Sequence, residues 1–463
     1  MREIYSIILA AGEGTRMRSS LVKVLHPLWG RPMLHYVLDL CQGLPFKGII
    51  VIVGHQAEKV KEALSGWNVE FVHQEEQLGT AHAVLQVEDR LRGFTGDLLV
   101  LSGDAPLLKK ETIEELIAFH FREGAAATIL TARVENPTGY GRVLRGKTGE
   151  VVKVVEEVEC NELQRKKNEI NAGIYCFSSD PLFRALQEVK ASARKGEYYL
   201  PEVLPIIKGW GLKVSAHLSP DPEEVLGINT RAELAHAMEV LRLRTLERLM
   251  EQGVTLLDPS KTYISDTAII GRDTVVYPGV FIEERTRIGE ACTIYPNCRI
   301  QASRIGDRVT ILDGSVIVDS EIANDCTIGP YAHFRPGTRL KRKAKVGNFV
   351  EVKKSVIGEG SKVPHLTYIG DTTMGDRVNI GAGTITCNYD GFQKHQTIIE
   401  DEVFVGSNVN LVAPVKVGKG AIIGAGSTIT QEVPSDSLAL ERSEQVNKEG
   451  WAARWRKKRK GKK

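Results

Sequence analysis

An aliphatic residue returns at intervals of six across the second half of the chain, from about position 264 to 429, and glycine often follows it. Clear examples are Ile270-Gly271, Ile288-Gly289, Ile305-Gly306, Val346-Gly347, Ile380-Gly381 and Val405-Gly406. A period of six matches neither a helix nor simple strand alternation. It predicts a parallel β-helix in which three hexads build one coil, with about eight coils in all. We expect the aliphatic side chains to point inward and the glycines to take positive φ at the corners.

This repeat resembles that of the hexapeptide-repeat acyltransferases, which fold as a left-handed β-helix. Periodicity does not specify handedness, so the resemblance supplies it. A series of separate β-hairpins is the alternative, and it would require turn signals at wider and less regular spacing.

Composition narrows the class of protein. The 463 residues are enough for two or three domains. A net charge of +3 predicts no general attraction to nucleic acid, and the seven scattered cysteines form no Cys-x-x-Cys pair that would indicate a zinc cluster. No apolar run approaches ~18 residues, and a strand-like run stands where a leader peptide would lie. We therefore expect a cytoplasmic protein that does not insert into membranes.

The first half of the chain opens with an apolar strand, predicted over 4–10, and a glycine-rich turn over 11–17. Such a turn between a strand and a helix presents backbone N–H groups to a phosphate. Arg16 and Lys23 add positive charge there. Because Gly-x-Gly alone is a weak signal, a tight turn without a ligand is the alternative.

Two further strands are predicted over 48–53 and 97–101, and Asp104 follows the second. Strand ends on an open α/β sheet line the ligand crevice. An aspartate there is suited to Mg²⁺, which prefers carboxylate and phosphate oxygens. The alternative is that Asp104 caps the next helix.

Three strings in this half, Leu9 to Met17, Lys23 to His26 and Gly30 to Pro32, together resemble the signature of the sugar-nucleotide pyrophosphorylases, and so does Gly103-Asp104-x-Pro-Leu. The resemblance implies a Rossmann-like α/β nucleotide-binding domain. Its loop would wrap a nucleoside triphosphate, and Lys23 would neutralise the phosphates. Val22 stands where the family usually has proline, so we expect a less rigid loop.

The same resemblance implies the rest of a uridylyltransferase site. The segment from Gln74 to His82 matches the one that reads uracil, and Asp104 and Asn229 would hold one Mg²⁺. Arg16 and Lys23 would be catalytic. The implied nucleotide- and sugar-binding residues are Leu9, Ala10, Gly12, Gly14, Lys23, Gln74, Gly79, Thr80, Gly141, Glu156, Asn171 and Asn229.

A long amphipathic helix is predicted over 230–252, where apolar residues recur at helical spacing until Gly253. We place the domain limits around it. Residues 1–229 form the uridylyltransferase domain, 230–252 a linker helix, 253–437 the β-helix acetyltransferase domain and 438–463 a basic tail.

Repeat phasing places Arg335 and Lys353 at the same hexad position, one coil apart. Two cations one strand spacing apart repel, so a shared anion explains them better than chance. Independent solvation of the two side chains is the alternative. Glu351 and Tyr368 also stack, and a nearby carboxylate can orient His365 as a general base. His333 occupies a different hexad position from His365, which argues against a zinc site.

Five strings of the β-helix and its loop resemble the acetyltransferase half of the bifunctional UDP-N-acetylglucosamine pyrophosphorylase/glucosamine-1-phosphate N-acetyltransferase family. They are Arg335-Pro-Gly, Gly347 to Lys354, His365 to Tyr368, Asn379 to Gly391 and Val405-Gly-Ser407. With the pyrophosphorylase motifs ahead of them, the resemblance covers nearly the whole chain. It implies acetylation of glucosamine 1-phosphate by acetyl-CoA. UMP transfer from UTP to N-acetylglucosamine 1-phosphate would follow, releasing pyrophosphate and supplying peptidoglycan, lipopolysaccharide and other envelope polymers.

The resemblance also implies residue roles and a homotrimer. His365 would be the base, Arg335 and Lys353 would hold the sugar phosphate, and Tyr368 and Asn379 would position the sugar. Residues implied for acetyl-CoA are Ala382, Asn388, Tyr389, Ser407, Ala425 and Arg442, with Asn388 also near the sugar. One alternative is a nucleotidyltransferase whose β-helix is only a structural trimerising element, and another is a non-enzymatic scaffold. The basic tail over 451–463 is expected to be solvated near the CoA phosphates, a nucleic-acid or anionic-surface role being its alternative.

Overall fold

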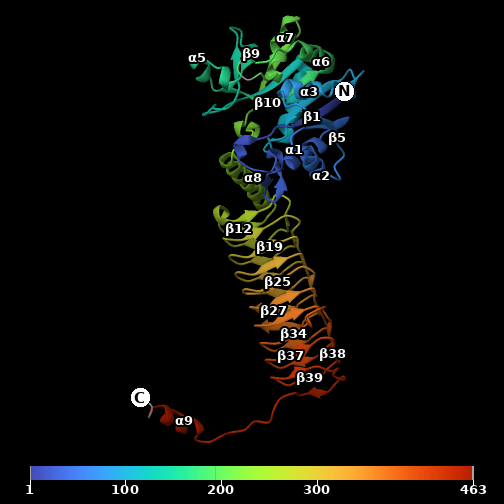
Figure 1. The fold of residues 1–463 in the computed structure, drawn as a ribbon, viewed down its shortest axis with the longest axis vertical. Helices are drawn as coiled ribbons and strands as arrows, with labels where there is room; N and C mark the ends of the chain where they lie inside the picture. Colours follow the sequence, from blue (N-terminus) through green and yellow to red (C-terminus); the bar gives the residue numbers. More distant parts are fainter. Residues whose placement is uncertain (1, 193, 195, 461–463) are drawn as a thin grey trace. The chain divides into compact units, whose positions relative to one another are not determined.

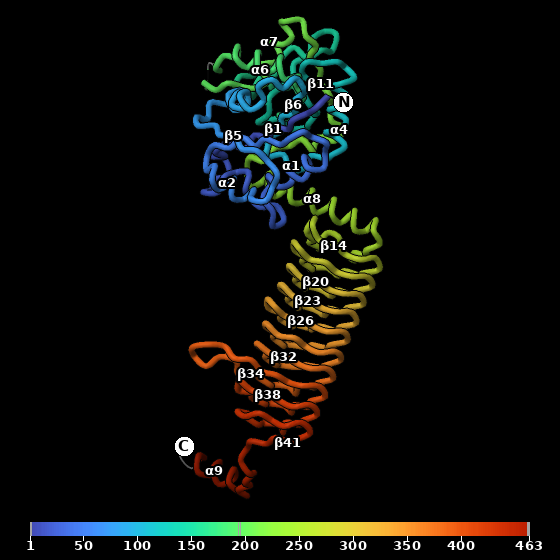
Figure 2. Tube along the Cα trace, turned by 90° about the vertical axis from the view of Figure 1, so that its right-hand side faces the viewer, coloured from blue at the N-terminus to red at the C-terminus, as the bar shows by residue number. Residues whose placement is uncertain are grey.

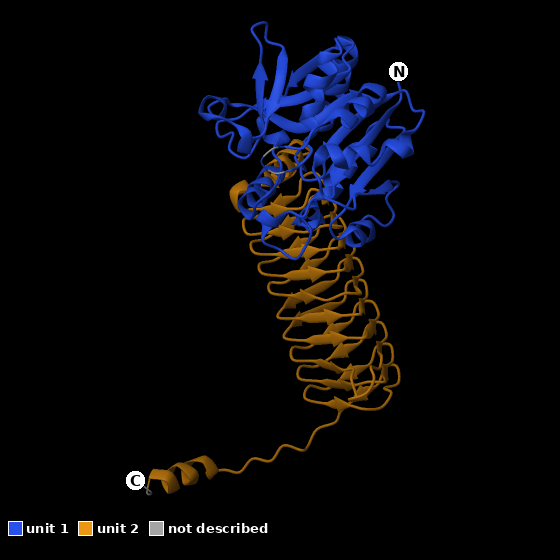
Figure 3. Ribbon diagram, turned by 45° about the horizontal axis from the view of Figure 1, so that its top comes forward, with its two compact units in different colours: residues 1–241 blue, residues 242–463 orange. Residues whose placement is uncertain are grey.

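The computed structural model describes residues 2–192, 194 and 196–460. It separates into two compact units, Met1–Leu241 and Arg242–Lys463 (Figure 3). The division falls within α8 (Arg231–Glu251), the helix predicted over 230–252, and Gly253 follows it with a φ of 91°. The domain limits at 229/230 and 252/253 stay predictions. Within the described ranges, no helix is both long and apolar enough to cross a membrane.

The first unit is built on a nine-stranded sheet with helices packed around it (Figure 1). The strands of this sheet are β1 (Ile4–Ala10), β4 (Gly48–Val53), β5 (Glu70–His73), β6 (Asp97–Ser102), β7 (Ala127–Arg133), β8 (Arg142–Arg145), β9 (Val151–Val155), β10 (Glu169–Ser178) and β11 (Val214–Leu218). The helices are α1 (Met33–Gln42), α2 (Ala57–Ala63), α3 (Thr80–Leu85), α4 (Lys110–Glu123), α5 (Glu162–Arg165), α6 (Ser179–Glu188) and α7 (Val203–Gly209). The short strands β2 (Pro27–Leu28) and β3 (Arg31–Pro32) pair separately.

The strand order is β11-β7-β10-β6-β1-β4-β5, with the β8–β9 hairpin attached to β10. β10 is antiparallel to both of its main neighbours, whereas β1 is parallel to β4 and to β6. The chain leaves β1 toward β4 on one side and returns to β6 on the other. Ligands bind at such a switch point, outside the carboxyl ends of the strands.

The central strands are buried on both faces, which is why they read as continuous apolar runs. Ile7 packs into the core on one face of the sheet and Ile8 into the core on the other, and neither is exposed. The strands predicted over 4–10 and 48–53 have those bounds, and the third extends one residue beyond its predicted end, to Ser102.

The second unit is a parallel β-helix of three sheets, in which each strand pairs with one a coil away (Figure 1). The first sheet contains β12 (Thr255–Leu256), β15 (Val275–Val276), β18 (Thr293–Ile294), β21 (Thr310–Ile311), β24 (Thr327–Ile328), β27 (Lys345–Asn348), β30 (Lys362–His365), β33 (Asn379–Ile380), β36 (Phe404–Val405), β39 (Ile422–Ile423) and β41 (Leu438–Ala439). The second contains β13 (Tyr263–Ile264), β16 (Phe281–Ile282), β19 (Arg299–Gln301), β22 (Val316–Val318), β25 (His333–Phe334), β28 (Glu351–Lys353), β31 (Tyr368–Gly370), β34 (Ile385–Cys387), β37 (Asn410–Val412) and β40 (Thr428–Ile429). The third contains β14 (Ile269–Ile270), β17 (Arg287–Ile288), β20 (Arg304–Ile305), β23 (Ser320–Ile322), β26 (Thr338–Leu340), β29 (Val356–Ile357), β32 (Thr372–Met374), β35 (Thr397–Ile399) and β38 (Val415–Val417).

The β-helix differs from the expectation in length. Its sheets hold eleven, ten and nine strands, so it is longer than the eight coils estimated from the repeat. The estimate was short because the end strands, β12 and β41, carry no aliphatic-glycine pair and lie outside 264–429. The aliphatic side chains do point inward, as expected: Ile294 and Ile300 are fully buried.

Most glycines of the aliphatic-glycine pairs serve a different purpose from the one predicted, whereas Gly329, with a φ of 92°, has the expected conformation. Gly271 and Gly289 are not at positive φ; a Cβ at Gly271 would lie 2.6 Å from the Gly289 carbonyl carbon. Positive φ occurs two residues later, at Asp273 (61°) and Ala291 (53°). Glycine is therefore required at these positions because the backbone of the next coil passes too close for any side chain.

Two segments depart from the stack. Residues 388–396, between β34 and β35, form a loop that projects from it (Figure 2). After β41, residues 440–450 contain no helix or strand, and α9 (Trp451–Lys460) follows them.

Candidate active sites

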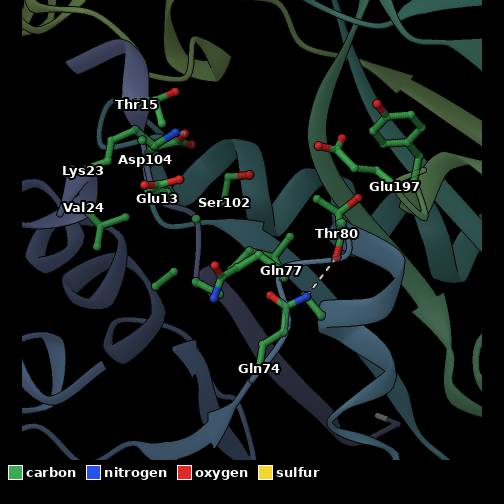
Figure 4. Close-up of a pocket in the computed structure, with 18 residues that line it drawn as sticks. Glu13, Thr15, Lys23, Val24, Gln74, Gln77, Thr80, Ser102, Asp104 and Glu197 are labelled. Carbon is green, nitrogen blue, oxygen red and sulfur yellow. Dashed lines mark hydrogen bonds and ion pairs between the residues drawn. The ribbon is translucent and has the colours of Figure 1, made fainter. Parts of the chain in front are cut away.

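A cavity of about 430 Å³ lies where β1 and β6 end, at the switch point of the sheet (Figure 4). Most residues predicted to bind the nucleotide line it. These are Leu9, Ala10, Gly12, Gly14, Lys23, Gln74, Gly79, Thr80 and Asp104. Asp104 does not cap the next helix, because α4 begins at Lys110 with Lys109 as its N-cap. Its carboxylate is instead directed to the cavity.

The glycine-rich loop is shaped around Lys23. Gly14 has a φ of 70°, and a Cβ there would lie 2.5 Å from the Lys23 Cβ, so the lysine stem packs directly on the loop backbone. Val22 is buried and has a φ of −57°, close to the value that proline imposes. Val22 therefore has the backbone φ that a proline would impose, and the effect of the substitution on loop rigidity stays a prediction.

Two oxygen-bearing side chains converge on one cation in this site. The Lys23 ammonium forms an ion pair with Asp104, and it also donates to the Asn229 amide oxygen at 3.1 Å. Arg16 donates to that same Asn229 oxygen at 2.7 Å. Asp104 and Asn229, which are far apart in sequence, thus present oxygens to a shared positive charge.

The segment predicted to read the base is held in place by a second segment. Gln74 is buried, and its amide donates to the Gly79 carbonyl at 3.2 Å. The Thr80 hydroxyl accepts from the Leu200 N–H at 2.9 Å, and Ala81 N–H donates to the Tyr198 carbonyl at the same distance. Two lining residues, Glu197 and Tyr199, were not predicted and lie outside every motif of the sequence.

Three predicted sugar-binding residues lie together in a second group. The Asn171 N–H donates to the Gly141 carbonyl at 2.9 Å, and a Cβ at Gly141 would lie 3.3 Å from a Glu156 carboxylate oxygen. The Asn171 amide donates to the buried Tyr175 hydroxyl at 2.7 Å, which fixes its orientation. None of the three is among the residues that line the 430 Å³ cavity.

A group of cations gathers on the β-helix. Arg335 directly follows β25 and Lys353 ends the neighbouring strand β28, in which Val352 pairs with Phe334 of β25. Lys394, from the projecting loop, contacts Lys353; this contact and the charges of Lys394 and Arg335 lower the pKa of Lys353. Lys394 could not be predicted, because the hexad rhythm stops in its loop.

The Glu351 carboxylate is not placed as expected. Glu351 pairs in register with Tyr368, as predicted, but its carboxylate accepts from Arg335 at 3.0 Å and lies 3.9 Å from His333 Nδ1. The exposed His365 instead places Nδ1 2.5 Å from the Asn348 amide oxygen. The expected carboxylate–imidazole pair is therefore wrong: Glu351 is occupied by Arg335, and the neighbour of His365 is one coil away in β27.

The residues predicted for acetyl-CoA fall into two places. Ala382, Ser407 and Ala425 occupy successive coils, since Asn408 N–H donates to the Ala382 carbonyl and Gly426 N–H to that of Ser407. Arg442 joins this column by donating to the Ala425 carbonyl at 3.1 Å. Asn388 lies in the loop nearer the cations, where its amide is 2.5 Å from Asp371 and 3.5 Å from the Tyr368 hydroxyl. Tyr389, in the same loop, is exposed. Asn379, which was predicted to position the sugar, is the first residue of β33, the strand that pairs with β30.

Comparison with known proteins covers both units. The nucleotidyl transferase family model matches residues 5–207, and the bacterial transferase hexapeptide (six repeats) model matches residues 396–431. Proteins named bifunctional protein GlmU are similar over almost the full length. The Exiguobacterium sp. protein is 51% identical over 98% of this chain and 100% of its own. Those of Pelobacter propionicus and Geobacillus sp. are 49% and 50% identical, over 99% and 97% of this chain and 100% and 98% of their own.

This chain belongs to the GlmU family. Membership confirms the predicted architecture, an α/β nucleotidyltransferase unit followed by a left-handed β-helix of hexapeptide repeats. It also confirms the predicted bifunctional enzyme of UDP-N-acetylglucosamine biosynthesis, with a nucleotidyltransferase and an acetyltransferase activity. Two alternatives, an enzyme with a single activity and a non-enzymatic scaffold, do not agree with membership of a bifunctional family.

Proposed function

We propose that this GlmU protein makes UDP-N-acetylglucosamine at two separate sites. The β-helix moves acetyl from acetyl-CoA to the amine of glucosamine 1-phosphate, and the α/β unit then joins the product to UMP from UTP. The observation that carries the proposal is the gathering of Arg335, Lys353 and Lys394 around one place on the β-helix, near the strand that ends in His365. Cations gathered this closely repel one another, and a β-helix with a purely structural role does not need them, whereas a bound phosphate would balance their charge.

The uridylyl step would use the groups that line the cavity. Backbone N–H groups of the Gly12–Gly14 turn and the Lys23 ammonium would hold the triphosphate, and Gln74 with Gly79 would hold the uracil. A phosphate oxygen of the sugar substrate would attack the α-phosphorus in line, and the bond to pyrophosphate would break. Gly141, Glu156 and Asn171 would hold the amino sugar.

Mg²⁺ fits this site through Asp104 and Asn229. Both side chains already offer oxygens to one ammonium, and a carboxylate with an amide oxygen is a suitable partial ligand set when substrate phosphates complete it. When bound there, Mg²⁺ supplies charge neutralisation at the triphosphate. Lys23 would then leave the carboxylate for the phosphates, and Arg16, which contacts Asn229, would keep that amide oriented.

The acetyl step would take place beside His365. Arg335 and Lys353 would bind the sugar phosphate, with Tyr368 and Asn379 positioning the ring. The amine would attack the thioester carbonyl, Nε2 of His365 would accept the amine proton, and CoA would leave as the thiolate. The Ala382–Ser407–Ala425 column, together with Asn388, Tyr389 and Arg442, would carry acetyl-CoA.

We also propose a cytoplasmic homotrimer that associates through the β-helix. Support comes from a column of large apolar residues at one corner, Tyr331, Phe349 and Leu366, which are 55%, 57% and 61% exposed. All three residues have positive φ. This backbone conformation costs roughly 1–2 kcal/mol for each residue that carries a side chain. Exposed apolar columns of this kind mark association surfaces. Phe349 and Leu366 of this column directly follow Asn348 and His365, so a covering subunit would enclose the acetyl site.

A thiol-release assay on the full chain tests the proposal. With acetyl-CoA and glucosamine 1-phosphate, the wild-type protein should release CoA, and His365→Ala should reduce this by roughly 10²–10⁴ while uridylyl transfer persists. A wild-type protein that transfers uridylyl but releases no CoA would favour the single-activity alternative with a structural β-helix.

A further inference from the structure

Asn348 and His365 occupy equivalent places on successive coils. They pair in register between β27 and β30, and their side chains meet at 2.5 Å between the amide oxygen Oδ1 and the ring nitrogen Nδ1. Asn348 is half-buried and His365 is exposed. The histidine therefore has one ring nitrogen engaged by the β-helix and the other available to a ligand.

An amide oxygen can only accept a hydrogen bond. Its contact with Nδ1 requires a proton on that nitrogen, and a neutral imidazole carries only one ring proton. The second nitrogen, Nε2, must then have a free lone pair. This is the tautomer that a general base needs if it is to take a proton through Nε2.

The backbone around the pair is fixed on both strands. The Leu366 N–H donates to the Asn348 carbonyl at 3.0 Å, and the Thr367 hydroxyl donates to the His365 carbonyl at 2.6 Å. Phe349 and Leu366, the residues that follow the pair, have φ values of 53° and 48°. Both side chains therefore project from equivalent corners whose backbone conformations match.

Two carboxylates near this pair, those of Glu351 and Asp371, have other partners than the His365 ring. Glu351, the expected carboxylate partner, is bound to Arg335 and lies near His333. Asp371, one coil further along, is bound to the Asn388 amide. The oxygen that contacts the ring is thus that of a neutral amide, which orients an imidazole without adding the charge of a carboxylate.

We propose that Asn348 is a positioning residue for acetyl transfer, fixing the tautomer and orientation of His365 so that Nε2 faces the amine as a base. This rests on the proposed role of His365. The competing possibility is that Asn348 is one more coil-to-coil contact of the β-helix. Asn410 provides a matched control, because its amide contacts Thr428 of the next coil at 3.3 Å and belongs to neither proposed site.

The test compares Asn348→Leu, Asn348→Asp, Asn410→Leu and His365→Ala in the full-length protein. Asn348→Leu should lower kcat for acetyl transfer roughly 10- to 100-fold, as residues that orient a reacting group commonly do, with KM for glucosamine 1-phosphate changed less than about twofold. Asn348→Asp should recover most of that rate, because a carboxylate still accepts from Nδ1–H. It should also move the acidic limb of the pH–rate profile to higher pH, because a negative charge favours imidazolium. Asn410→Leu should leave kcat and the profile unchanged.

Uridylyl transfer measured on the same samples shows whether each variant is folded. ¹⁵N NMR of the histidine rings in the wild-type protein determines the tautomer of His365 directly. The expected spectrum has His365 protonated at Nδ1. A ring protonated at Nε2, a normal kcat in Asn348→Leu, or a loss in KM alone would overturn the inference. If His365→Ala retains full acetyl transfer, the proposed base is wrong. If His365→Ala fails but Asn348→Leu does not, only the role of Asn348 is wrong.

Discussion

The Lys23 ammonium is paired with the Asp104 carboxylate at the cavity where we propose that UTP binds. Both side chains are largely buried, with 16% and 17% of their surfaces exposed. Removal of one residue of such a pair leaves the charge of the other uncompensated, so each residue stabilises the other. Under the proposed function, a phosphate group would replace Asp104 as the partner of the Lys23 ammonium, and Mg²⁺ would replace Lys23 as the partner of the carboxylate.

Removing either partner should abolish uridylyl transfer and spare acetyl transfer. Lys23→Ala and Asp104→Ala should each lower the uridylyl rate by two or more orders of magnitude, because the charge on the phosphates is no longer neutralised. Pyrophosphate release measures this step, and thiol release on the same sample measures the other. Lys61→Ala is a suitable control, since the Lys61 side chain forms an exposed ion pair with Glu58 and does not line the cavity. A folded Asp104→Ala protein that loses both activities would contradict separate sites.

Metal removal should separate the two activities in the same way. A chelator should stop uridylyl transfer, and added Mg²⁺ should restore it, while thiol release continues unchanged. Asn229→Ala should raise the Mg²⁺ concentration for half-maximal rate, because one of the two protein oxygens is lost. The assignment of Asn229 fails if this variant has the wild-type Mg²⁺ dependence.

The cations of the β-helix should act through binding of the sugar phosphate. Lys353→Gln or Arg335→Gln should raise KM for glucosamine 1-phosphate by roughly 10- to 100-fold, the effect of losing a hydrogen bond to a charged group. Lys341→Gln controls for net charge, because Lys341 lies in the β-helix but pairs with Asp376. Unchanged KM in both site variants would favour two independently solvated side chains.

The trimer should depend on the corner column of the β-helix. Tyr331→Asp places a charge where a partner subunit would pack, so sedimentation should show dissociation, and acetyl transfer should fall while uridylyl transfer stays. Leu163→Asp, at an exposed site on the α/β unit, should change neither property. A wild-type monomer with full acetyltransferase activity would exclude the proposed assembly.

Much of the fold was predictable, because each coil repeats one local requirement. The six-residue period placed Ile294 and Ile300 inside, and hexad phase put Arg335 beside Lys353 and Glu351 beside Tyr368. In the α/β unit, buried apolar runs set the strands, and the turn after β1 marked the cavity.

The remaining details depend on contacts that no repeat encodes. The position of Glu351 in its hexad places it near several possible partners, but it does not predict that Arg335 will donate to its carboxylate. The Asn348–His365 contact depends on where two side chains project from a corner. Lys394 belongs to a loop outside the hexads. The Tyr198–Leu200 segment contacts the segment that we propose to hold the base only through the tertiary fold.

The central claim, that one chain carries two independent sites joined by a diffusible intermediate, is tested most directly by mixing two inactive variants. His365→Ala and Asp104→Ala proteins are each incubated with glucosamine 1-phosphate, acetyl-CoA, UTP and Mg²⁺, alone and together, and the products are separated by chromatography. We predict that His365→Ala alone leaves the sugar unacetylated, that Asp104→Ala alone accumulates N-acetylglucosamine 1-phosphate, and that the mixture forms UDP-N-acetylglucosamine. Failure of Asp104→Ala to accumulate the acetylated sugar phosphate, or failure of the mixture to form the nucleotide sugar from it, would contradict the claim.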